Sequence, residues 1–188
     1  MQSFVKEYTY ILNAIYYCMW LQQINFSKII YNLLYIFFSK ILFLLPTTLK
    51  NRFEYNTKYR AQKVDKFYRD KKTGFCIAET NHWFGYEYSS YPCFISFVLS
   101  GLVYKYVNIG DNPVVLLLIL AIPMGICYIP AYKAVFSNDR YLKYFKEFEK
   151  EDEQWHKKWN RITILFRIGG VLSTIVGIIS AICIIKYL

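Results

Sequence analysis

Several residue patterns that carry chemistry are missing from this sequence. It contains only two histidines, His82 and His156, and no HExxH segment, so a histidine-rich metal site is excluded. The pair Gly169-Gly170 lies in an apolar stretch without a following Lys-Ser or Lys-Thr, so it is not a phosphate-binding loop. No serine nucleophile elbow is present either. We therefore expect no cofactor, no metal and no enzymatic activity.

Cysteine usage is also uninformative for chemistry. The chain has five cysteines, an odd number, and no CxxC pair. Cys93, Cys127 and Cys183 lie in apolar runs, where cysteine behaves as a small hydrophobic residue. We therefore expect no disulfide framework.

The N-terminal apolar run at residues 8–21 lacks the basic start and the small-residue cleavage site of a signal peptide. We therefore expect no cleaved signal peptide.

Hydrophobic and aromatic residues are abundant: they make up 55% and 20% of the 188 residues. Residues 168–185 carry no charge. As a helix this stretch would be about 27 Å long, which is enough to cross the hydrocarbon core of a bilayer. Within this run Gly169, Ser173, Gly177 and Ala181 recur every fourth residue and form one stripe. Such a stripe is typical of a helix-packing or oligomer face, although small residues are common in membrane helices generally.

Other apolar stretches suggest further membrane spans. We predict about four: 28–46, 91–107, 113–131 and 164–186. Residues 28–46 have a second interpretation. Lys28, Asn32, Tyr35 and Ser39 share one helix face, so this stretch also fits an amphipathic helix that lies flat on a membrane. Residues 1–27, with scattered polar and aromatic side chains, suggest an interfacial or extracytoplasmic helix, with a poorly hydrophobic span as the rival interpretation.

Positive charge is concentrated in two segments. The chain has a net charge of +10, and residues 47–90 and 132–161 together hold 17 of its 23 lysines and arginines. Because membrane proteins retain basic residues in the cytoplasm, we predict that 47–90 is a basic cytoplasmic loop and 132–161 a cytoplasmic amphipathic helix. The hairpin 91–131 would separate them, and 162–188 would carry the last span. This topology places the C-terminus outside, together with residues 1–27 if 28–46 spans.

One helix is predicted to run from residue 138 to residue 185, because neither glycine nor proline interrupts the stretch before Gly169. Ser137-Asn138-Asp139 would cap its start. Four of its aromatic residues are candidates for docking a partner: Phe145, Phe148, Trp155 and Trp159. Arg167, together with Lys40 in the earlier span, is a candidate charge for a pore or for the membrane interface.

Two further groups of polar residues are candidates. Glu79 and His82 are three residues apart and would share a helix face, which is the minimum for acid–base catalysis; the simpler interpretation is a polar cap at the membrane surface. Attraction to anionic lipid or to a partner would explain the basic loop. We do not expect it to bind nucleic acid directly. The loop residues concerned are Lys58, Arg60, Lys63, Lys66, Arg69, Lys71 and Lys72.

These patterns predict an all-α polytopic transmembrane bundle of the inner membrane, with a small basic cytoplasmic layer and a long C-terminal helix. The function that fits best is non-enzymatic. The protein would form a homo-oligomer or bind a membrane or cytoplasmic protein partner, and would anchor that partner or relay its signal to the membrane, as a defence-system effector or toxin-immunity protein does. The alternatives are a channel or transporter subunit, and a membrane enzyme that uses Glu79 and His82.

Overall fold

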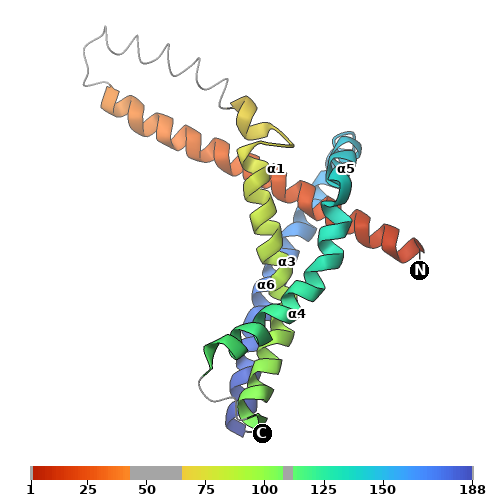
Figure 1. The fold of residues 1–188 in the computed structure, drawn as a ribbon. Helices are drawn as coiled ribbons and strands as arrows, with labels where there is room; N and C mark the ends of the chain where they lie inside the picture. The colour runs from red at the N-terminus through yellow and green to blue at the C-terminus, as the bar shows by residue number, and fades with distance from the viewer. Residues whose placement is uncertain (1, 43–64, 108–111, 188) are drawn as a thin grey trace. The chain divides into compact units, whose positions relative to one another are not determined.

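The computed structural model describes residues 2–42, 65–107 and 112–187, and every regular element in these ranges is helical (Figure 1). The all-α prediction is therefore confirmed for the described residues. The elements in order are α1 (Gln2–Leu42), α3 (Phe75–Tyr106), α4 (Pro113–Val135), the short 3₁₀ helix η1 (Ser137–Asp139), α5 (Arg140–Phe148) and α6 (Glu153–Tyr187). A short helical turn at residues 65–69 precedes α3.

The chain divides into two compact units. The larger unit comprises Met1–Cys18 and His82–Leu188, and the smaller unit comprises Met19–Asn81. Both α1 and α3 contribute residues to each unit.

In the larger unit α3 and α6 run in the same direction. The side chain of Glu87 is paired with Arg167 near the start of the contact, and Lys105 Nζ donates a hydrogen bond to the carbonyl oxygen of Ile184 near its end. The helix α4 runs in the opposite direction to α3, because Ser96 Oγ donates to the carbonyl oxygen of Leu120, whereas Phe84, earlier in α3, packs on Phe136, which follows α4.

Two helical stretches are long and apolar enough to cross a membrane. They lie within Val114–Phe148 and Glu153–Tyr187, and their most apolar windows both have a mean hydropathy of 2.5. Only 6% and 11% of these windows are buried inside the protein. Apolar helices with so little burial could cross a membrane. The described part of 28–46 and residues 91–107 are not among these stretches.

The predicted uninterrupted helix from 138 to 185 is wrong. The helix α5 ends at Phe148, and α6 begins at Glu153, where Asp152 Oδ1 accepts a hydrogen bond from the backbone N–H of Trp155 and starts a new helix. At the predicted cap Ser137-Asn138-Asp139, the residue Asp139 occupies the N-cap position of α5 but makes no side-chain capping hydrogen bond, and both Asn138 and Asp139 have positive φ angles, of 56° and 51°.

Three further boundaries differ from the predictions. The helix α1 passes through residues 27 and 28 without a break, so the two predicted segments belong to one helix. The predicted loop 47–90 is helical from Phe75 onward. Residues 75–78, whose apolar sequence also fits a short strand or buried turn, form the first turn of α3. Finally, α4 continues through Pro130 to Val135, four residues beyond the predicted span 113–131.

Two local predictions are confirmed. The helix α4 begins at Pro113, where a missing backbone N–H costs nothing, and Asn112 caps it through its side-chain oxygen. The second is a break at Thr73-Gly74, which a glycine in this polar stretch predicts and which the structure contains as a turn. Asp70 Oδ1 accepts hydrogen bonds from the backbone N–H groups of Lys72 and Thr73, at 2.7 and 3.1 Å, which lowers the pKa of the Asp70 carboxyl. A Cβ atom at position 74 would clash with the carbonyl oxygen of Asp70, so only glycine fits this turn.

Candidate functional site

An aromatic cluster forms one end of the larger unit. Its centre is Tyr16 of α1, which is fully buried and has four aromatic rings with centroids 5.3 to 5.6 Å from its own. Those rings belong to Phe84, Phe136, Tyr141 and Phe145. The cluster thereby joins the first half of α1 to α3, to the end of α4 and to α5.

The four aromatic residues predicted to dock a partner belong to this cluster. Phe145 and Phe148 are 0% and 1% exposed, and Trp159 is also buried. Trp155 stacks on Phe148 at 4.8 Å, and its Nε1 donates to the hydroxyl of Tyr10 at 3.0 Å. Phe145, Phe148 and Trp159 are therefore part of the protein's own core, whereas Trp155 is half-buried. Their spacing along the helix is accounted for by packing on α1, and a role in docking a partner stays a prediction.

A polar contact crosses the same core. Asn13 is fully buried, and its Nδ2 donates to the carbonyl oxygens of Thr9 and Ala134, at 2.7 and 3.1 Å. The second of these bonds ties α1 to α4. Burial of two groups near Asn13 raises the pKa of the Tyr17 hydroxyl to about 12 and that of the Cys18 thiol to about 11. Both groups therefore stay neutral at physiological pH. No acid–base chemistry follows from them.

The predicted stripe of small residues on α6 lies against α3 of the same chain. A Cβ atom at Gly177 would lie 2.9 Å from the Cα atom of Phe94, and one at Gly101 of α3 would lie 3.0 Å from the Cα atom of Ala181. The hydroxyl of Tyr91 occupies the space where a side chain at Gly169 would lie, and Ser173 Oγ donates to the carbonyl oxygen of Tyr91 at 3.4 Å. The stripe therefore packs two helices of one chain at close range.

Arg167, the candidate pore or interface charge, is paired. Its Nε lies 2.9 Å from Oε1 and 3.1 Å from Oε2 of Glu87, whose side chain is only 16% exposed. Burial raises the pKa of the Glu87 carboxyl, although the Arg167 guanidinium acts in the opposite direction. Lys40, the other candidate, is exposed on α1.

The Glu87 carboxyl should make the protein less stable as pH rises. The folded state binds the proton of Glu87 more tightly than the unfolded state, so this group stabilises the fold fully at low pH and less as pH passes its raised pKa. We expect Glu87→Gln to lose less thermal stability than the wild type between mildly acidic and neutral pH. Thermal unfolding in detergent across that range measures the difference, and parallel curves for the two proteins would contradict it.

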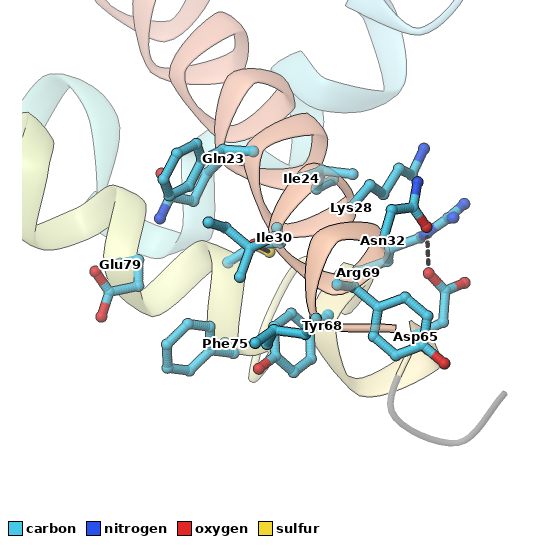
Figure 2. Close-up of a pocket in the computed structure, with 15 residues that line it drawn as sticks. Gln23, Ile24, Lys28, Ile30, Asn32, Asp65, Tyr68, Arg69, Phe75 and Glu79 are labelled. Atoms are coloured by element: carbon cyan, nitrogen blue, oxygen red, sulfur yellow. Dashed lines mark hydrogen bonds and ion pairs between the residues drawn. The ribbon is translucent and has the colours of Figure 1, made fainter. Parts of the chain in front are cut away.

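A groove of about 590 Å³ lies in the smaller unit (Figure 2). It runs between α1 on one side and residues 65–69 with the first turns of α3 on the other. Apolar side chains such as Ile24, Ile30 and Phe75 line it together with Lys28 and Asn32. Figure 2 also shows the ion pair between Arg69 Nε and Asp65 Oδ1, at 2.9 Å, beside Asn32.

The predicted lipid or partner contacts are only partly described. Lys58, Arg60 and Lys63 lie outside the described residues. Lys66 and Lys72 are exposed, and Arg69 is paired with Asp65. Lys71 Nζ lies 5.9 Å from the ring centroid of Trp20, where a cation–π attraction holds it. The contact of these residues with lipid stays a prediction.

The suggested acid–base pair remains a prediction too. Glu79 lines the groove of the smaller unit, whereas His82 is exposed on α3 where the larger unit begins. In the described ranges, no group of three or more His, Cys, Asp or Glu residues has the arrangement that a metal ion needs.

No protein-family model, curated protein or solved structure matches this chain.

Proposed function

We propose that this chain is a non-enzymatic integral protein of the inner membrane that self-associates or holds a cytoplasmic protein partner, anchoring it or relaying its signal to the bilayer. The observation that carries the proposal is the exposed apolar surface of α4 and α6, of which 6% and 11% are buried in the most apolar windows. At roughly 25 cal/mol per Å² of apolar surface removed from water, leaving two such helices in water would be strongly unfavourable.

Three helices cross the bilayer in this proposal: α4, α6 and the second half of α3. Residues 91–106 are less apolar, but two of their polar side chains, Ser96 and Lys105, bond to other helices. Ser96 is buried and donates to the carbonyl oxygen of Leu120, and Lys105 Nζ donates to that of Ile184. Because α3 packs along α6 from Glu87 to Lys105, it accompanies α6 through the membrane.

The basic residues set the orientation. In this three-span arrangement the far end of the helices carries only Lys105 and Lys186, whereas the end with the aromatic cluster carries Lys133 and the basic residues of α5 and of the first turns of α6. Retention of basic residues in the cytoplasm therefore supports a cytoplasmic aromatic cluster and an external C-terminus.

The packing within the chain favours other surfaces for association. The small-residue stripe packs on α3, and Phe145, Phe148 and Trp159 are buried. Self-association would therefore use the outer faces of α4 and α6. A cytoplasmic partner would meet the charged outer face of α5 and of the start of α6, where Lys143, Lys146 and Lys158 are exposed.

The orientation is tested by labelling single cysteines from outside intact cells, in a background that lacks the five native cysteines and is first shown to fold. An impermeant maleimide should modify Lys186→Cys readily and should reach Lys146→Cys only after lysis. Both positions are exposed in the structure. Modification of Lys146→Cys in intact cells would overturn the proposed topology.

The association itself is tested by purification in mild detergent, followed by the mass of the complex and identification of co-purifying proteins. A stable oligomer or a stoichiometric partner is the expected result. A monomer without a partner would contradict the functional part of the proposal and leave the membrane topology standing.

A further inference from the structure

In the larger unit, the first half of α1 and the part of α3 that begins at His82 both lie at the end that carries the aromatic cluster. Tyr16 packs on Phe84, with ring centroids 5.4 Å apart, and Tyr10 packs on Phe148 of α5 at 5.3 Å. The chain therefore leaves the larger unit at Cys18 and returns to it at His82 on one side of the membrane. This conclusion rests on the membrane-spanning part of the proposed function.

A chain that leaves and returns on the same side crosses the bilayer an even number of times in between. Residues 19–81 contain one stretch apolar enough to be considered as a span, 28–46, because residues 47–72 are rich in charge. One crossing is odd. This parity favours the rival interpretation of 28–46, an amphipathic helix on the membrane surface, over a span.

The side chains of α1 agree with a surface position. Ile29, Leu33 and Phe37 lie on one face and are 57%, 58% and 61% exposed. On the other face, Lys28 and Asn32 line the groove together with Asp65 and Arg69, as Figure 2 shows. A crossing by this part of α1 would take the charges of residues 65–69 toward the hydrocarbon, which is unfavourable.

We propose that α1, over residues 26–38, binds the cytoplasmic surface of the same membrane and that anionic lipid headgroups are its ligand. The apolar face enters the boundary between headgroups and acyl chains, while the face with Lys28 and Asn32 stays in water with residues 65–69. Lys28 and Lys40 bracket the apolar stretch, and Lys40 is long enough to reach a lipid phosphate from the apolar side.

The test places an environment-sensitive fluorophore on Leu33→Cys, and on Tyr35→Cys as the matched control, in the full chain reconstituted in phosphatidylcholine–phosphatidylglycerol vesicles. Tyr35 is also exposed, at 53%, but shares the polar face. Lipids brominated near the headgroup should quench the label at position 33 several times more than that at 35. Stronger quenching at both positions by bromines at the bilayer centre would show a span, and no quenching would show a helix in water; either result overturns the inference.

Lipid charge is tested with Lys28→Gln and Lys40→Gln together. The quenching at position 33 should be greater in vesicles with phosphatidylglycerol than in pure phosphatidylcholine, and the double variant should lose this difference. Lys143→Gln, on α5, is the matched control and should keep it. If the double variant behaves like the control, anionic lipid is not the ligand. None of these results changes the labelling expected at positions 146 and 186, so failure of this inference is distinguishable from failure of the proposed function.

Discussion

Replacing Gly177 by leucine should separate α3 from α6 and destabilise the protein strongly. A Cβ atom at this position would lie 2.9 Å from the Cα atom of Phe94 and 3.2 Å from the Cδ2 atom of Phe97, so the shortest contact is with backbone, which cannot move aside as a flexible side chain can. Overpacking of a well-packed interior costs about 1–3 kcal/mol for a few added methylenes, and a leucine against backbone should reach the upper end or exceed it. The midpoint of thermal unfolding in detergent, with size-exclusion chromatography as its readout, measures this loss of stability.

Gly125 of α4 offers a matched control. It also lies in an apolar helix, but nothing lies within 4 Å of a Cβ atom built on it. Gly125→Leu should therefore leave the thermal midpoint unchanged or raise it, because leucine is the better helix former. Equal losses in the two variants would show that any leucine in these helices is harmful and would contradict the close contact of α3 with α6.

Replacing Phe145 by alanine should have a comparable effect at the other end of the larger unit. Phe145 is 0% exposed, and its ring lies 5.0 Å from that of Tyr17 and 5.6 Å from that of Tyr16. Removal of a buried phenylalanine side chain typically costs 3–5 kcal/mol, about a third or more of the stability of an ordinary domain. Thermal unfolding in detergent checks this value.

The comparison with Phe4→Ala separates burial from loss of an aromatic residue in general. Phe4 is 72% exposed on the same α1 helix that packs on α5, so its removal should change the midpoint little. A Phe145→Ala protein that unfolds like the wild type, yet loses a co-purifying partner, would instead restore the docking role that the spacing of aromatic residues suggested.

The amino-acid sequence by itself determined the all-helical character of the described residues and the two most apolar helices, because both properties follow from local composition and from uncharged runs such as 168–185. It also determined the breaks at Gly74 and Pro113, where the backbone requirements of a single residue decide the outcome. It did not show that α5 and α6 are separate helices. The cap by Asp152 competes with a continuous helical pattern, and the packing of Phe148 on Trp155 favours the break.

Only the tertiary structure decided which surfaces meet. A stripe such as Gly169 to Ala181 shows that something approaches closely, but the same stripe suits a second subunit or, as here, a helix of the same chain. Phe145 and Trp155 show the same ambiguity, since an apolar seam has the same spacing whether it docks a partner or packs on α1. Helical periodicity reports which face of a helix is apolar, whereas the identity of the covering element depends on contacts between residues far apart in the sequence.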